Sequence, residues 1–159
     1  MSSQDAGEWD SAAWRRARDA KLLEWLGDPD AVQAILAVST AAEVWDDAYD
    51  RDKEPDMDAA MTALFLVLPM NRFWAAHQNW FTPIITVAIN AWMDARVMEK
   101  SDDQTQRAEA FVLRNFGIEL ALLAIFILRG FAVMRALSMD VREFFRHQSF
   151  RQWEQEHGH

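Results

Sequence analysis

One stretch, residues 116–137, constrains the fold more than any other part of this sequence, because it is the longest strongly apolar segment. A long apolar run without strict alternation is typical of a helix that is buried on most of its surface. Elsewhere helix signals are frequent, and β-branched residues do not alternate with polar ones as a strand requires. We therefore predict an all-α, multi-helix bundle wrapped around a central apolar helix. On that helix, Leu123, Phe126 and Ile127 should be almost fully buried.

The same stretch raises the question of a membrane span. A spanning helix needs about 20 predominantly apolar residues, but the uncharged run between Glu119 and Arg129 covers only nine. Each charge at bilayer depth costs roughly 2.5–3.5 kcal/mol. We therefore expect a soluble helix and no membrane association. Gly117 and Gly130 bracket the run and are the positions where the helix should kink, end or contact another helix closely.

Capping residues and prolines predict where the other helices begin and end. The first helix should run from Ser11 to Leu26 and end at Gly27, and Asn71 should cap a later helix. Helices should also restart at three further signals: Thr40-Ala-Ala-Glu43, Thr82-Pro83, and Ser138 or Asp140.

The composition suits one ordinary domain. The chain has 159 residues, of which 51% are hydrophobic, so a sizeable core is available. It contains no cysteine, and its start lacks the basic and apolar blocks of a signal peptide. We expect a single helical domain over residues 1–159, frayed at 1–8 and 154–159, in the cytoplasm.

The net charge of −9 is concentrated in one region. Between positions 28 and 58, ten acidic residues stand against two basic ones, which gives −8 in 31 residues. This balance disfavours binding to nucleic acid through its phosphates. It favours a cation, a basic partner or simple solvation.

Four carboxylates of this region share one face of a helix. Their spacing of i, i+3, i+4 and i+7 places them side by side. They are Glu43, Asp46, Asp47 and Asp50. Like charges at this spacing repel, and Mg²⁺, which prefers oxygen ligands, would relieve the repulsion. The sequence therefore offers a magnesium site or, as the alternative, an acidic face that is solvated or docked on arginines of the same chain.

Two short resemblances bear on this acidic face. Asp46-Asp47-Ala48-Tyr49-Asp50 resembles the DDxxD signature of helical prenyl synthases, in which the aspartates hold Mg²⁺ against a diphosphate; no second aspartate-rich motif follows. Glu43-x-x-Asp46 resembles the E-x-x-E helix of MazG-type nucleotide pyrophosphohydrolases. For their second helix, E-x-x-D, the chain offers only Asn90-x-x-x-Asp94 and then Glu99, which departs from the pattern. Both resemblances imply a Mg²⁺-dependent enzyme acting on a phosphate-bearing small molecule.

Glu119 is a further candidate for chemistry, because a carboxylate in an apolar helix is costly unless it is paired. It should pair with Arg114, Arg129 or an arginine of another helix, or serve as a catalytic acid. In the enzyme hypothesis, Glu119 or Asp94 assists the metal ligands. The acidic face must then meet Asp94, Glu119 or His77 across a cleft.

The C-terminal region mixes arginine with aromatic residues, which is the composition of interface hot spots. The candidate interface residues are Arg142, Phe145, Arg146 and Trp153. The same composition also permits cation–π pairs within one bundle. With the small size, the lack of a diagnostic motif and eight tryptophans, it favours a non-enzymatic interaction or assembly protein, cytoplasmic or virus-encoded. Such a protein binds another protein or itself and needs no cofactor; the Mg²⁺-dependent enzyme is the alternative.

Overall fold

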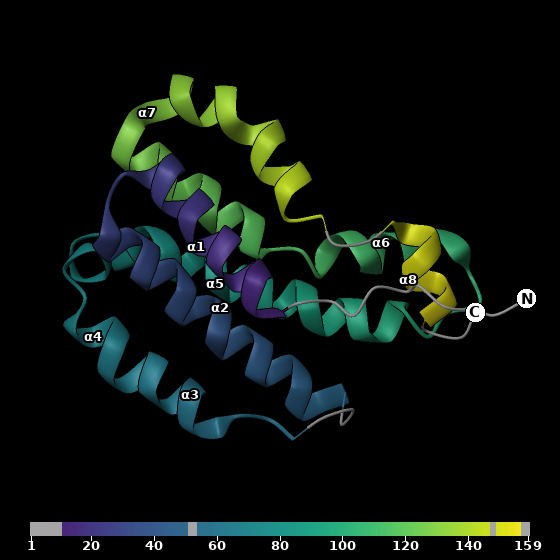
Figure 1. Cartoon of the computed structure of the whole chain (residues 1–159). Coiled ribbons are helices and arrows are strands. Elements are labelled where there is room, and N and C mark those ends of the chain that lie inside the picture. Colours follow the sequence, from purple (N-terminus) through teal and green to yellow (C-terminus); the bar gives the residue numbers. More distant parts are fainter. Residues whose placement is uncertain (1–10, 51–53, 147–148, 157–159) are drawn as a thin grey trace, which may run out of the picture.

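The computed structural model describes residues 11–50, 54–146 and 149–156, and within these ranges every regular element is a helix (Figure 1). The elements are α1 (Ser11–Leu26), α2 (Pro29–Asp50), α3 (Met57–Thr62), the π-helical turn η1 (Ala63–Val67), α4 (Leu68–Met70), α5 (Arg72–Met98), α6 (Gln104–Leu113), α7 (Gly117–Phe144) and α8 (Phe150–Glu156). The predicted all-α class is confirmed.

The centre of the bundle is shared between α2 and the first part of α7. In the described ranges, α2 packs against α1, α3, η1, α4, α5 and α7, whereas α7 packs against α1, α2 and α5. The inner face of α2 is built mainly from alanine, valine and isoleucine, and these small or compact side chains let several helices approach it. From α7 the core receives Leu120, Ala121, Leu122, Ala124 and Ile125. The apolar stretch is therefore a core helix, but it shares the central place with α2.

The burial predicted for Leu123, Phe126 and Ile127 is wrong, because all three side chains are only half-buried. Leu123 and Phe126 line a groove of about 410 Å³ between the two parts of α7. The core is formed by the neighbouring face of this helix, which carries Leu120 and Ile125. This part of α7 buries one stripe of side chains against α1, α2 and α5 and leaves its other side partly exposed.

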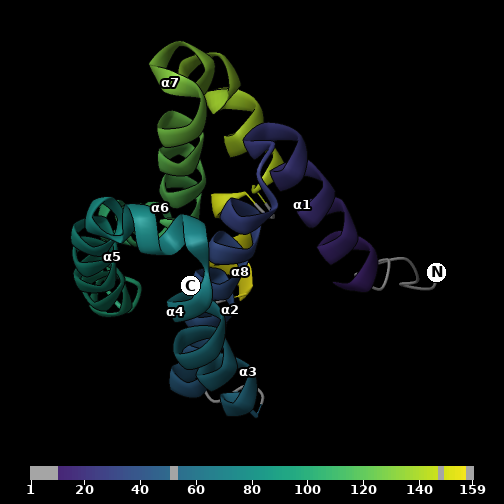
Figure 2. The ribbon, with the colours of Figure 1, turned by 90° about the vertical axis from the view of Figure 1, so that its left-hand side faces the viewer.

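α7 is a hairpin of two helical arms joined at Gly130, whose φ of 82° and ψ of 171° are accessible to glycine and strained for other residues. Figures 1 and 2 show the second arm turning back beside the first. The arms, residues 117–129 and 131–144, are each about 20 Å long. The expectations for both glycines are met, since Gly117 begins α7 and Gly130 bends it.

By length and composition, α7 is apolar enough to cross a membrane, with 28% of its most apolar window buried. Within the described residues, Met57–Met70 with Arg72–Met98 passes the same test only as a pair bent by 106°. Each arm of α7 is shorter than the hydrocarbon thickness of about 30 Å. The bend at Gly130 therefore removes the straight span that the composition alone suggests.

Two predicted helix ends are confirmed in detail. α1 runs from Ser11 to Leu26, and Gly27, with a φ of 67°, ends it. The side chain of Asn71 accepts a hydrogen bond from the backbone N–H of Trp74 at 2.8 Å and caps α5. The same side chain donates to the carbonyl of Asp30 at 2.8 Å, which ties the start of α5 to the start of α2.

Three predicted restarts do not occur, because α2 runs through Thr40, α5 through Pro83 and α7 through Ser138. Tertiary packing on both sides of these positions outweighs the local capping signal. In α5 the missing N–H of Pro83 withdraws a donor from the carbonyl of Asn79, but both residues are exposed, so water can replace it.

A small second core closes the other end of the molecule. Trp153 of α8 is buried against Ala95 of α5 and Ala110 of α6. Arg107 of α6 and Glu154 of α8 form an ion pair of 2.9 Å with both side chains largely buried. The fraying expected from residue 154 therefore does not apply to Glu154, and the expectations for 1–8 and 157–159 lie outside the described residues.

Candidate functional site

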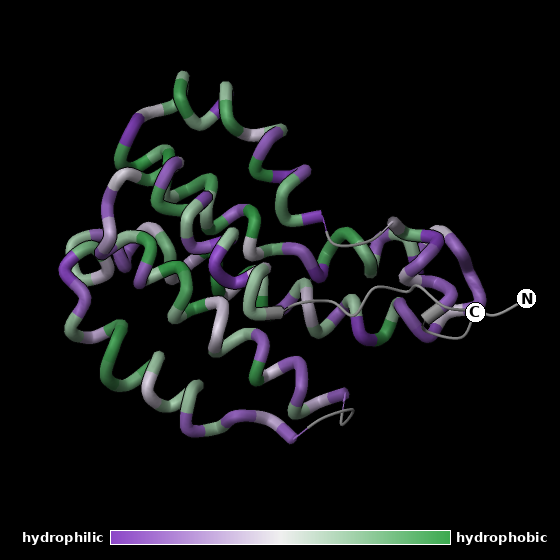
Figure 3. Tube along the Cα trace, viewed as in Figure 1, coloured by the Kyte–Doolittle hydropathy of each residue, from purple (hydrophilic) through white to green (hydrophobic). Residues whose placement is uncertain are grey.

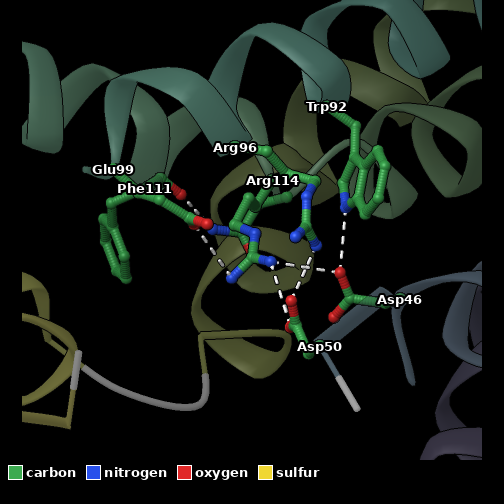
Figure 4. A network of polar contacts seen from close by, with 8 residues as sticks. Asp46, Asp50, Trp92, Arg96, Glu99, Phe111 and Arg114 are labelled. Carbon is green, nitrogen blue, oxygen red and sulfur yellow. Dashed lines mark hydrogen bonds and ion pairs between the residues drawn. The ribbon is translucent and has the colours of Figure 1, made fainter. Parts of the chain in front are cut away.

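Two arginines from other helices reach the acidic face of α2 (Figure 4). Arg114, at the end of α6, donates from Nη2 to Oδ1 of Asp46 at 3.1 Å and to Oδ2 of Asp50 at 3.3 Å. Arg96 of α5 donates to Oδ1 of Asp50 at 2.7 Å. These two arginines thus engage two of the four carboxylates that the helical spacing places on one face.

Arg114 also holds a third carboxylate. Its Nη1 lies 3.5 Å from Oε2 of Glu99, a residue that is buried at the C-terminal end of α5. A guanidinium carries five N–H donors in a fixed fork, so one arginine can serve several carboxylate oxygens. Through Arg114, the ends of α2, α5 and α6 are tied at one point.

Aromatic rings cover this network. The indole Nε1 of Trp92 donates to Oδ1 of Asp46 at 3.0 Å. The guanidinium carbon of Arg96 lies 4.8 Å from the ring centroid of Tyr49 and 5.2 Å from that of Trp92. The side chains of Arg96 and Arg114 are only 18% and 16% exposed. Ion pairs and cation–π contacts that are partly removed from water are worth more than fully exposed ones.

The other two acidic residues lie at the edge of this network. The carboxylate of Glu43, 59% exposed, lies 3.7 Å from Nη1 of Arg18 of α1, and Asp47 is half-buried. Among the described residues, no group of three or more histidine, aspartate or glutamate side chains is placed to hold a metal ion. The acidic face is docked on arginines of its own chain, which is one of the two arrangements that the sequence left open.

The candidate catalytic residues contact other partners. Glu119, on the first arm of α7, pairs with Nη2 of Arg142 on the second arm at 2.8 Å, and both side chains are about half exposed. Asp94 accepts a hydrogen bond from Asn90, one turn earlier in α5, at 3.1 Å. Their partners therefore belong to their own helices and not to the acidic face of α2.

The candidate interface residues also make contacts within the chain. Phe145 packs on Trp14 and Trp25 of α1, with ring centroids 6.2 Å apart in both pairs. Arg142 is the partner of Glu119, and Trp153 belongs to the second core. Arg146 is the exposed member of the set. This arrangement favours a role within one bundle for most of the C-terminal arginine and aromatic residues.

Sequence reasoning missed an apolar surface on the segment formed by α3, η1 and α4. Six large side chains of this segment point outward and are 43–82% exposed; we call them the outer face: Met57, Met61, Leu64, Phe65, Leu66 and Met70. The opposite side of the segment, with Ala60, Ala63 and Leu68 buried, packs on α2. The signal was present in the sequence, since residues 57–70 carry a single charge, Asp58, and a helix that is apolar all round is typically buried.

The π-helical turn η1 widens this surface. Leu64, Phe65 and Leu66 are consecutive in sequence and all exposed, at 43%, 65% and 59%. A π-turn closes over one residue more than an α-turn and is often found at functional sites. Figure 3 shows this segment mostly in green shades along one edge of the molecule.

Comparisons of this chain with protein-family models, with curated proteins and with solved structures find no match.

Proposed function

We propose that this chain is a non-enzymatic interaction protein that binds a protein partner, either a different protein or a second copy, through the outer face of α3, η1 and α4. The observation that carries the proposal is that six large apolar side chains of one helical segment are left uncovered on a folded chain. Soluble monomers rarely expose contiguous apolar patches larger than a few hundred Å² unless these patches bind something.

The chemistry of the outer face suits a protein partner. Three of its six residues, Met57, Met61 and Met70, are methionines, whose unbranched side chains adapt to the shape of a partner surface. Phe65 supplies an aromatic group of the kind that is enriched in interface cores, where charged residues are depleted. An apolar helix face packing against a complementary protein surface is a recurring mode of recognition.

The contacts of the acidic face of α2 also support a non-enzymatic role. Asp46 and Asp50 accept hydrogen bonds from arginine and tryptophan of the same chain. These contacts give the carboxylates a role in holding helices together. The internal contacts of Asp46 and Asp50 do not depend on a bound metal.

Site-specific photo-cross-linking in cells that produce the protein tests this proposal. A photoreactive residue replaces Phe65, and the matched control replaces Gln78, an exposed polar residue of α5. We expect discrete protein adducts at position 65 and few at position 78. Equal yields at the two positions, or no protein adduct at position 65, would contradict an interaction role for the outer face.

A further inference from the structure

We infer that the partner of the outer face is a second copy of this chain, packed antiparallel across a two-fold axis near Phe65. This inference depends on the proposed function and names its partner. In such an isologous interface the same patch serves both copies, so the patch must be complementary to itself. The outer face meets this requirement in its apolar character and in the charges at its two ends.

The charges favour an antiparallel pair. The N-terminal end of the segment is acidic, with Glu54, Asp56 and Asp58, and no further charge occurs until Arg72. The side chain of Arg72 is 91% exposed, and its contact with Asp30 at 3.1 Å leaves most of the guanidinium in solvent. Asp58 lies at the start of this segment, and Arg72 follows it at the bend of 106° between Met57–Met70 and Arg72–Met98. A two-fold axis near Phe65 therefore directs the acidic end of one copy toward the Arg72 end of the other. Parallel packing would place like charges together.

The exposed area is of the size that a dimer requires. If the area of an aromatic side chain, about 150–250 Å², is taken as the upper limit for each residue, the exposed fractions of the six residues amount to at most roughly 500–900 Å² per chain. A standard stable interface buries about 800 Å² on each partner. The π-turn contributes to this area by keeping Leu64, Phe65 and Leu66 outward together.

A lipid surface fits the outer face less well than a second copy does. Helices that lie on membranes are typically rich in lysine and arginine, which are attracted to anionic headgroups. Residues 54–71 contain no lysine or arginine and three acidic residues, in a chain of net charge −9. An anionic bilayer would therefore repel the segment, whereas a second copy offers Arg72 to its acidic end.

Sedimentation analysis of the full chain over a range of concentrations is the first test. We expect a species of twice the 18.4 kDa chain mass that dissociates on dilution. Phe65→Ser with Leu66→Ser should give a monomer with an unchanged helical spectrum. Val97→Ser with Val112→Ser removes side chains that are 74% and 68% exposed on α5 and α6 and should leave the dimer intact.

A charge exchange tests the antiparallel arrangement. Asp58→Arg and Arg72→Asp should each weaken the dimer by several-fold in Kd, because each places like charges at both ends of the pair. The two changes together restore opposite charges and should restore the dimer. Arg72→Asp also places a second carboxylate beside Asp30, and because the side chain of Arg72 is 91% exposed, this change should affect the stability of the single chain only slightly.

Several outcomes would overturn the inference. They are a monomer at every concentration, a dimer that survives Phe65→Ser with Leu66→Ser, open-ended association, or no recovery in the double exchange. Cross-links from position 65 to a different protein alone would overturn the second copy while leaving the proposed function in place. Co-sedimentation with phosphatidylcholine or phosphatidylglycerol vesicles that the same double serine variant abolishes would assign the outer face to a membrane and overturn both.

Discussion

The acidic face of α2 and the outer face of α3, η1 and α4 lie on neighbouring helices and differ in whether other parts of the chain contact them. The acidic face is conspicuous in the sequence, yet Arg96 and Arg114 of the same chain engage two of its carboxylates. The outer face carries no recognisable motif in the sequence, yet its six large apolar side chains remain exposed. A dense cluster of carboxylates can thus be paired with arginines of the same chain, while the apolar surface that remains exposed lies on a different helix.

The physical reason is that the two kinds of surface need different partners. A carboxylate needs only one or two well-placed donors, and a single arginine can supply several. An apolar face needs area, and α2 covers only one side of the segment from α3 to α4.

The two sides of the apolar segment should respond very differently to the same substitution. Leu68 is 5% exposed and Leu66 is 59% exposed. Leu68→Ala should lower the free energy of unfolding by about 2–5 kcal/mol because it leaves a cavity against α2. Leu66→Ala should change it by less than about 0.5 kcal/mol in dilute, monomeric protein. Chemical denaturation at low protein concentration measures both, and equal losses would show that the segment is covered on both sides.

Arg114 should matter more than an arginine in an exposed pair. Arg114→Met leaves Asp46, Asp50 and Glu99 without a shared cation, and hydrogen bonds to charged groups contribute about 1.5–3 kcal/mol. Arg142→Met removes the partner of Glu119 in a pair that is about half exposed on both sides, where about 0–1 kcal/mol is expected. Thermal melts compare the two variants. If Arg142→Met lowered Tm more than Arg114→Met does, the arginine network at α2 would not be the larger contribution to stability.

Neutralising the acidic face should destabilise the protein. Helical spacing alone predicts that Asp46→Asn with Asp47→Asn relieves repulsion and leaves the protein no less stable. Because Asp46 accepts from Arg114 and Trp92, we expect instead a loss of about 1–2 kcal/mol. This corresponds to a fall in Tm of roughly 2–8 °C for a chain of this size. An unchanged or higher Tm would show that repulsion among the carboxylates outweighs their hydrogen bonds to Arg114 and Trp92.

Magnesium should have the smallest effect. A site that bound Mg²⁺ only in the folded state would raise stability by about 2.7 kcal/mol at a hundredfold excess over Kd. With the carboxylates engaged by arginine, millimolar Mg²⁺ or Mn²⁺ should shift Tm no more than monovalent salt of equal ionic strength does. Native mass spectrometry provides an independent measurement. A stoichiometric metal adduct would show that the pairing of the carboxylates with arginine does not prevent metal binding.

Sequence patterns located the elements of both faces but not their partners. The spacing of Asp46 and Asp50 on one side of a helix follows from the helical period alone. Which cation meets them depends on how the α5–α6 pair returns past α2, a contact between residues 46 and 114 that are 68 positions apart. For Glu119 an arginine partner was expected, but the bend at Gly130 selects Arg142, a residue of the same α7, as that partner.

By itself, the sequence determined the all-α class, the first helix with its end at Gly27, the Asn71 cap and the two glycine positions in α7. These features depend on local preferences for backbone conformation and on hydrophobic period, which neighbouring residues decide. Tertiary structure alone decided that α2 shares the centre, that Leu123, Phe126 and Ile127 are only half-buried, and that the outer face of α3, η1 and α4 is uncovered. Burial is a property of which helices pack together, and an apolar helix carries no local signal that says which of its sides a neighbour will cover.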